Sequence, residues 1–567
     1  MKGKEIMNKT CLFLSLSICA LASMMLFNSC NNELSDNTPF EQSSFIKNAD
    51  LWRTPSMTDN GGFYFETDVE TRGSFNIELL KESIDSNKVG NYISPRPAVK
   101  AYEWGYSVLN LKTGTQDGSG RVINNIYLDS SPRTREEALN TIKTFIINQY
   151  VNGADHPWGS MNGHHCWHHY AGEWGFDVLG SEIGENIHGY QFHIAMNRGA
   201  ARQYQKPWFV DFSMWFGPGI LDYSSTPIWK GYSGVNNGHS LSLMERSFVM
   251  SYMSGANAIN AEAGAAISFY SEIDPDTNCY KLSPYGEICR DFYEFTNNNP
   301  DVGITYTPVA IVLNYYHGLD RQPSGNKAFG KFVYGPGDLM THDLVDAIWK
   351  DTWAVESNGN EIGALSNNTY GDSFDFLLQN ASQDVLNSYP ALVLSGDMYL
   401  SDEEIARYKN YVQQGGVLVL NTAYLDQFPE YAGELKNDRY EVSDGEGKVI
   451  VYGPDYDVSV LKVILKELVD KLMPIKLSTD IQSIVNIKDG YIYVTLINNS
   501  GVTKTFYDSV QIDKSAAKKV TVSYTGNHKV SQIRDIYNGN KSLSVRKNSC
   551  SLELQPGAIA VLEIKIG

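Results

Sequence analysis

The sequence is poor in cysteine and in basic residues, and each shortage excludes a class of protein. Only seven cysteines occur in 567 residues, and none forms a CxxC pair of the kind that binds structural zinc. Lysine and arginine total 46 against 65 aspartates and glutamates, which gives a formal net charge of −19. Because nucleic-acid binding needs a basic face, this balance argues against such a partner. It fits a protein that acts on neutral or cationic ligands.

The N-terminus predicts export. A basic start precedes the apolar run CLFLSLSICALASMMLF at residues 11–27, which is too short and wrongly flanked for a stable membrane span. We interpret residues 1–29 as a signal peptide. Cys30 follows the small residue Ser29, which resembles a bacterial lipoprotein processing site, so Cys30 is the expected lipidation site. Residues 30–59 are predicted to form a flexible tether to a lipid anchor, and ordinary cleavage of a secreted protein is the alternative.

Two further cysteines suggest a crosslink. Cys279 and Cys289 lie ten residues apart, and in an exported protein they could form a disulfide. Cys166 and Cys550 have no evident role.

Three folded units follow the tether. A length of 567 residues predicts roughly three or four domains, and a hydrophobic content of 42% is enough for full cores. Residues 60–303 alternate strand-like and helix-like stretches, which predicts a parallel sheet, and their number matches a (β/α)8 TIM barrel. A helix is expected over 134–151, where Thr134 and Glu137 form a capping box.

The two later units have different patterns. Residues 304–474 repeat strand, capped helix, glycine stop and strand, which indicates a doubly wound α/β domain. Residues 475–567 consist of short alternating runs separated by turn signals, which indicates a small antiparallel β-sandwich.

Two glutamates end predicted strands of the barrel. Glu182 follows the apolar run that begins at Phe176, and Glu262 ends the run ANAINAE. Catalytic groups of a barrel sit at the carboxyl ends of its strands, and glycoside hydrolysis needs two carboxyl groups there. Glu182 is therefore a candidate acid/base and Glu262 a candidate nucleophile. Glu185 is the competitor of Glu182, because it begins the next helix, where it could also bind a sugar hydroxyl.

Other polar and aromatic residues are candidates for positioning a sugar. Asp211 and Trp215 share one face of the next strand, and Asn260 shares the face of Glu262. Asn186 directly follows Glu185. The histidine-rich segment 164–169 surrounds a tryptophan, and we interpret it as a sugar-binding ring. Its candidate residues are His164, His165, Trp167 and His168. A metal site is the alternative, since His164 and His168 are one helical turn apart. Packing of these rings in a core is also possible.

The order of units resembles the three-domain glycoside hydrolases of the family 42 β-galactosidase kind. Those proteins join a (β/α)8 barrel, a class I glutamine amidotransferase-like domain and a small β-sandwich. The segment LSPYGEICRDFYEF at 282–295 looks like the closing helix of such barrels. In that family the acid/base follows an Asn at the end of strand four and the nucleophile ends strand seven. Here Ser181 precedes Glu182, so the match rests on strand-end position alone.

The resemblance also implies a role for the second unit and a setting for the protein. No cysteine lies between residues 290 and 549, so an amidotransferase-like thiol nucleophile is impossible there. That unit is then expected to be structural or to mediate homo-oligomerisation. The lipoprotein signal resembles those of surface glycan-degrading systems of Gram-negative gut bacteria, which implies an outer-membrane location and a carbohydrate substrate.

These observations predict a lipid-anchored glycoside hydrolase, retaining, that needs no cofactor and no metal. Two other functions stay open. One is a non-catalytic glycan-binding lipoprotein on the same fold. The other is a metal-dependent hydrolase that uses the histidines of segment 164–169.

Overall fold

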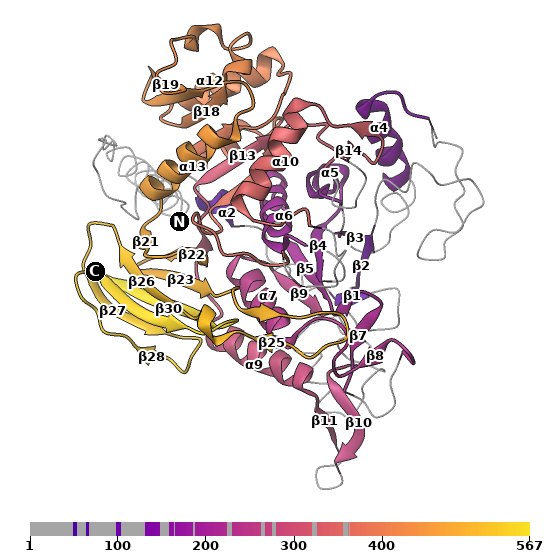
Figure 1. Ribbon diagram of the computed structural model, residues 1–567. Helices are drawn as coiled ribbons and strands as arrows, with labels where there is room; N and C mark the ends of the chain where they lie inside the picture. The colour runs from indigo at the N-terminus through magenta and orange to yellow at the C-terminus, as the bar shows by residue number, and fades with distance from the viewer. Residues whose placement is uncertain are drawn as a thin grey trace, which may run out of the picture.

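The computed structural model has three stacked parts (Figure 1). It describes residues 49–53, 64–66, 98–103, 131–147, 158–163, 165–184, 188–223, 229–261, 267–274, 279–319, 326–354, 361 and 363–567. We call the parts the first, second and third domain in chain order. None of the helices in these ranges is long and apolar enough to cross a membrane.

A six-stranded parallel sheet forms the first domain, with strands paired in the chain order β1-β2-β3-β4-β5-β9. The strands are β1 Tyr64–Glu66, β2 Ala98–Glu103, β3 Trp158–Asn162, β4 Val178–Gly184, β5 Trp208–Ser213 and β9 Ala258–Ala261. The connecting helices are α4 Arg135–Ile146, α5 His168–Trp174, α6 Tyr190–Tyr204 and α7 Leu241–Met253. The predicted mixed α/β class is confirmed.

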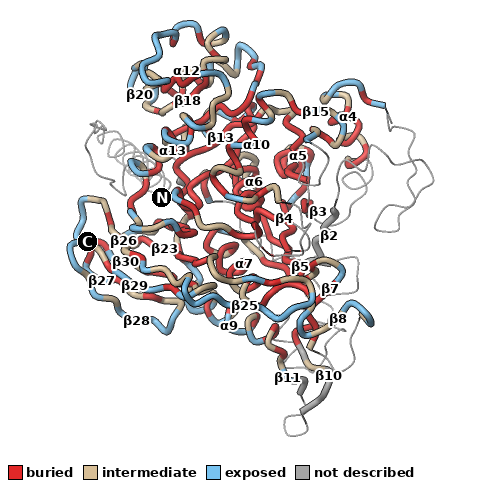
Figure 2. The backbone as a smooth tube through the Cα atoms, viewed as in Figure 1, coloured by how far each residue is buried: buried red, intermediate tan, exposed pale blue. Residues whose placement is uncertain are grey.

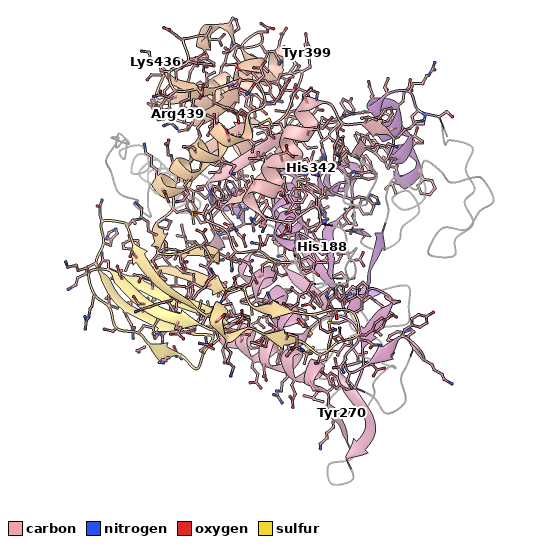
Figure 3. The ribbon with its side chains drawn as sticks, in the orientation of Figure 1. His188, Tyr270, His342, Tyr399, Lys436 and Arg439 are labelled. Carbon is pink, nitrogen blue, oxygen red and sulfur yellow. The ribbon has the colours of Figure 1, made fainter. Side chains whose placement is uncertain are left out.

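The described residues supply six of the eight predicted barrel strands. After β9 come the antiparallel pair β10 Phe269–Asp274 and β11 Cys279–Leu282, and then helix α9 Pro284–Asn298. Strands β10 and β11 bond to each other and stand away from the body, with Tyr270 near the foot of the molecule (Figures 1 and 3). Within the described residues β9 is the sixth strand of the first-domain sheet, and it ends at Ala261, directly before Glu262 in the sequence.

The predicted crosslink in this region is also wrong. Cys289 is a free, buried thiol on α9, where burial raises the pKa of the thiol well above its usual value. Its side chain packs into the core, whereas Cys279 begins strand β11.

Local sequence explains where the helices begin. The Thr134 hydroxyl accepts a bond of 3.1 Å from the amide of Glu137, as the capping-box pattern predicts. Ser240 caps α7 in the same way, through a 3.1 Å bond from the amide of Leu243. Each side chain satisfies an amide that the helix itself leaves unpaired.

The second domain is a sheet ordered β16-β13-β17-β18-β20-β19, parallel except for β19. Its strands are β13 Val309–Leu313, β16 Phe374–Leu378, β17 Ala391–Leu394, β18 Val417–Asn421, β19 Arg439–Asp444 and β20 Gly447–Tyr452. Its longer helices are α10 Pro336–Ile348, α12 Asp402–Gln413 and α13 Val458–Leu472. The first strand lies between later ones, which is the arrangement of a doubly wound sheet.

The third domain consists of two antiparallel sheets, ordered β12-β22-β23-β30-β27-β28 and β21-β26-β29. Its longest strands are β22 Gln482–Lys488, β23 Tyr491–Ile497, β26 Lys518–Tyr524, β27 Val530–Asp535, β29 Ser549–Leu554 and β30 Ile559–Ile566. Strand β12, Ile304–Thr305, also joins this domain by pairing with β22. The chain therefore touches the third domain before it enters the second.

Helix α6 is the junction between the first and second domains. Thirteen of its fifteen residues are buried, because one side faces β4 and the other faces β16 (Figure 2). A side chain at Gly199 would place its Cβ 1.9 Å from the carbonyl oxygen of Phe376, so only glycine permits this approach.

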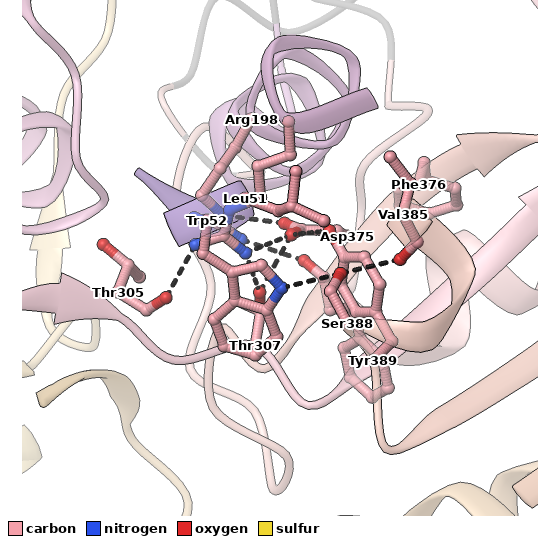
Figure 4. Close-up of polar contacts among 12 residues, drawn as sticks. Leu51, Trp52, Arg198, Thr305, Thr307, Asp375, Phe376, Val385, Ser388 and Tyr389 are labelled. Carbon is pink, nitrogen blue, oxygen red and sulfur yellow. Dashed lines mark hydrogen bonds and ion pairs between the residues drawn. The ribbon is translucent and has the colours of Figure 1, made fainter. Parts of the chain in front are cut away.

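An ionic cluster fixes this junction (Figure 4). Asp375 on β16 accepts bonds from Arg198 Nε at 2.7 Å and from Arg202 Nη1, both on α6. Its remaining donors are Tyr389 at 2.8 Å and Thr307 at 2.9 Å. Burial raises the pKa of Asp375, but the two guanidinium groups and these bonds more than offset that effect, so the pKa is lowered.

A segment of the predicted tether packs beside this cluster. Helix α2, Ala49–Trp52, places the indole of Trp52 4.6 Å beneath the guanidinium of Arg202. The indole N–H donates to Ser388 Oγ at 3.0 Å, and the ring contacts Tyr389 at 5.4 Å (Figure 4). Trp52 is only 8% exposed. Residues 49–52, near the end of the segment interpreted as a tether, therefore belong to the packed part of the molecule.

Candidate functional site

A row of three polar side chains crosses the first-domain sheet near the carboxyl ends of its strands. Glu182 on β4 lies in register with Asp211 on β5, which lies in register with Asn260 on β9. In-register residues of parallel strands point to the same face. Asn260 Nδ2 donates to Asp211 Oδ1, which ties two strands of the row together.

The row faces away from the covering helices. The neighbouring Ser181 donates to the carbonyl of His193 on α6 at 3.4 Å, so alternation points Glu182 to the opposite face of β4. Glu182 is 6% exposed, and Asp211 and Asn260 are 2% exposed. A carboxyl group in such a setting interacts with its neighbours far more strongly than it would in water.

Two glycines of β4 shape the space beside the row. A Cβ on Gly180 would lie 2.2 Å from the ring of Phe209, which fills the layer below Asp211. Gly184 ends the strand with a φ of +88°, and a Cβ there would lie 2.0 Å from the carbonyl oxygen of Ser213. Both positions require glycine, so the backbone of β4 comes close to β5 on either side of Glu182.

An aromatic pair follows the row along β5. Trp215 lies four residues beyond Asp211, is half-buried and meets Trp229 edge to face at 5.4 Å. Its backbone N–H donates to Ser213 Oγ at 3.3 Å. Flat aromatic faces near buried carboxyl groups are typical of small-molecule sites, where a few polar groups fix the orientation of the ligand.

The histidine segment lies elsewhere. His168 begins α5, is 0% exposed and meets His193 of α6 at 5.9 Å. Burial, reinforced by the nearby His169, lowers the pKa of His168 to about 3. His169 itself bonds the carbonyl of Phe376 at 2.9 Å, and burial lowers its pKa to about 4. These rings are neutral core groups between the first and second domains.

The two remaining described members of that segment pack against the second domain. His165 stacks on Trp167 at 4.7 Å, and Trp167, which is 0% exposed, contacts Phe329 at 5.5 Å. His168 therefore belongs to the layer of helices and does not join the row, because α5 packs on α6. Among the residues that the structure describes, no group of three or more His, Cys, Asp or Glu is placed to hold a metal ion.

Five predicted site residues lie outside the described residues. They are Cys30, His164, Glu185, Asn186 and Glu262. In the sequence, Glu262 directly follows Ala261, the last residue of β9.

Sequence reasoning missed two further buried acids. Asp222 follows strand β7, Gly219–Leu221, and is 3% exposed. Glu361 comes from a loop of the second domain and is 7% exposed. No motif marks either residue, and only burial reveals them.

Comparisons with known proteins give a likeness of fold only. No protein-family model matches the chain, and no curated protein matches it. Among solved structures, a β-galactosidase from Bacillus circulans sp. alkalophilus is similar at a TM-score of 0.43 and 10% identity, covering 76% of this chain and 66% of that one. An exo-carrageenase from Bacteroides ovatus gives 0.41 and 12%, covering 76% and 55%. The α-L-fucosidase isoenzyme 2 from Paenibacillus thiaminolyticus gives 0.41 and 10%, covering 86% and 90%.

Proposed function

We propose that this protein is a glycoside hydrolase that acts on an oligo- or polysaccharide. The observation that carries the proposal is the row of Glu182, Asp211 and Asn260 at the carboxyl ends of adjacent parallel strands. Parallel α/β domains place their reactive groups at this edge. Glycoside hydrolysis needs one carboxyl group to protonate the leaving oxygen and a second to attack the sugar or to activate water.

In the proposed mechanism Glu182 is the general acid/base and Glu262 the nucleophile. Glu182 protonates the glycosidic oxygen while the carboxylate of Glu262 attacks the anomeric carbon. Glu182 then removes a proton from the water that hydrolyses the covalent intermediate, so the anomeric configuration is retained. Asp211 is on β5, between the strands that carry Glu182 and Asn260, and it accepts a hydrogen bond from Asn260. This position suits Asp211 to bind a sugar hydroxyl. Glu185 and Asn186 follow β4 and are proposed to bind the same sugar.

The export features stay part of the proposal. Cys30 would carry the lipid that anchors the protein to the outer membrane, and the second domain would mediate any homo-oligomer.

The acid/base role is tested with Glu182→Gln on a panel of aryl glycosides and oligosaccharides. An amide cannot deliver a proton, so kcat/KM should fall by about 10²–10⁴-fold on substrates with poor leaving groups. Dinitrophenyl glycosides should keep a kcat/KM near that of the wild type, because that leaving group departs without protonation, whereas their kcat should fall because hydrolysis of the intermediate still needs Glu182 as base. Asp177→Asn is the matched control, since Asp177 is exposed just before the amino end of β4.

Equal losses on both kinds of substrate would overturn the acid/base assignment. A wild-type protein that binds sugars but cleaves nothing on the panel would favour the glycan-binding alternative.

The nucleophile is tested by azide rescue. In Glu262→Ala, added azide should take the place of the carboxylate and give a glycosyl azide of inverted configuration. Asp211→Asn should give none. Rescue of an Asp211→Ala protein instead would transfer the nucleophile role to Asp211.

A further inference from the structure

The connection between β5 and α7 is an unusually long excursion over residues 214–240. Its described ranges, 214–223 and 229–240, contain the short strands β6 Trp215–Phe216, β7 Gly219–Leu221 and β8 Ser233–Gly234. The excursion starts three residues after Asp211 and carries Trp215, Asp222 and Trp229. Its two ends meet, because the amide of His239 donates to the carbonyl of Met214 at 3.2 Å.

The buried carboxylate of Glu361, from the second domain, bonds the last residues of this excursion. Glu361 Oε1 accepts from the amide of Ser240 at 2.5 Å and faces His239 Nδ1 at 3.2 Å, while Oε2 accepts from the Ser240 hydroxyl at 2.8 Å. Ser240 is the N-cap of α7, so the carboxylate also meets the positive end of the helix dipole. The Glu361 side chain is 4% exposed.

The third domain holds the same excursion from another side. Lys504 Nζ donates to the carbonyl of Asn236 at 2.8 Å, and the Lys504 carbonyl accepts from the amide of Glu361 at 3.1 Å. Phe506 packs edge to face on Phe216 at 4.6 Å and fills the space beside Gly217. The second and the third domain therefore both contact the 214–240 excursion.

Packing alone does not explain a buried charge at this place. A buried carboxylate is expensive unless it is hydrogen-bonded, and an apolar group of similar size would join two domains at lower cost. The carboxylate adds a fixed geometry, because charged hydrogen bonds are directional. It bonds the N-cap of α7, Ser240. The adjacent His239 bonds the carbonyl of Met214, the first residue after β5.

We propose that Glu361 is a positioning residue for the row of Glu182, Asp211 and Asn260. Together with Lys504 of the third domain, it fixes the 214–240 excursion. Trp215 and Asp222 of this excursion are thereby kept at the end of β5. The clause about the row rests on the proposed function, whereas the holding of the excursion does not. The second and third domains then contribute to the geometry of the site in the first domain.

The test compares Glu361→Gln with Asp372→Asn in the full chain. Asp372 is the matched control, because it is also a buried second-domain carboxylate that joins both other domains. It accepts from Gln191 of α6 at 2.7 Å and from Gln482 of β22 at 2.9 Å, and no bond of its carboxylate reaches the excursion within the described residues.

Hydrogen exchange measured by mass spectrometry reads the position of the excursion without a substrate. In Glu361→Gln the amides of 214–240 should exchange about tenfold faster than in the wild type, since one charged bond is worth about that factor. In Asp372→Asn they should exchange at the wild-type rate. Unchanged exchange in Glu361→Gln, or equal acceleration in both variants, would overturn the proposal.

Two further measurements keep the outcomes separate. If Glu361→Gln does not fold, Ser240→Ala and Lys504→Met weaken the same clamp from the first and third domains and should each accelerate exchange in 214–240. On a substrate that the wild type cleaves, Glu361→Gln should raise KM more than it lowers kcat. A wild type without hydrolase activity would refute the proposed function and leave the exchange comparison standing.

Discussion

Two buried sets of carboxylates lie on opposite sides of strand β4, and they are built differently. On the side of α6, Asp375 meets two arginines, a threonine and a tyrosine. On the other side, Glu182 and Asp211 stand in one row with the neutral amide of Asn260.

The two sets of carboxylates have different partners, and we assign them different roles. A carboxylate held by two guanidinium groups cannot take up a proton without leaving buried positive charge behind, so it serves to fix the junction. Asp375 therefore fixes the junction of two domains, whereas Glu182 and Asp211, in the row on the side of β4 away from α6, carry the chemistry that we propose.

The largest expected effect comes from neutralising one member of each set. Asp375→Asn leaves the arginines Arg198 and Arg202 without their counter-charge, and we expect the free energy of unfolding to fall by about 3–5 kcal/mol. Asp211→Asn should change it by less than about 1 kcal/mol but lower kcat/KM by about 100-fold. Denaturant unfolding and steady-state kinetics on both proteins measure the contrast. A large stability loss in Asp211→Asn would erase the distinction.

The next effect concerns Trp52, which packs against the ionic cluster around Asp375. Trp52→Ala should lower the free energy of unfolding by about 3–4 kcal/mol, because it opens a cavity and removes the ring beneath Arg202. Trp229→Ala is a matched control on the half-buried excursion and should cost less than half as much in denaturant unfolding. A Trp52→Ala protein of wild-type stability would show that α2 only rests on the surface.

A smaller effect should appear on mild acidification. The folded pKa values of His168 and His169 are about 3 and about 4, below the usual 6.5, so the unfolded chain binds more protons between those values and pH 6.5. Stability should therefore fall as the pH drops from 6.5 to 5, by on the order of 1–2 kcal/mol per histidine. Asp372, whose pKa is raised because of burial, acts in the opposite direction.

Urea unfolding at pH 7 and pH 5 measures this slope. The double variant His168→Gln with His169→Gln should lose the part of the slope that these two residues contribute. The buried His317, whose pKa is also lowered well below its usual value by burial, acts in the same direction and should keep its part. A slope as steep as that of the wild type in the double variant would place the acid sensitivity outside His168 and His169.

Local sequence predicts those features that depend on near neighbours. The cap at Thr134 and the strand that carries Glu182 near its end follow from patterns a few residues long, and the structure shows both, with the strand running to Gly184. The place of Glu182 beside Asp211 also follows, because parallel strands bring their carboxyl ends to one edge.

Features that depend on distant partners are not predictable in this way. The segment around His168 has the composition of a site, yet it is core, because a second sheet more than 200 residues away covers α5 and α6. Trp52 sits in a polar stretch, and its partners Arg202 and Ser388 are far along the chain. Glu361 lies 121 residues from the serine that it holds. Only the fold brings such groups together.

The in-register row limits how this protein can evolve. Side chains along a strand alternate between faces, so deleting or adding one residue in β5 before Asp211 would turn this carboxylate toward the helices. The lengths of the strands before the row are therefore constrained, whereas connections beyond the strand ends can change in length and composition wherever the later domains do not hold them, as they hold 214–240 at Asn236 and Ser240. Changes of substrate preference in this lineage should accumulate as exchanged connections on an unaltered frame of strands.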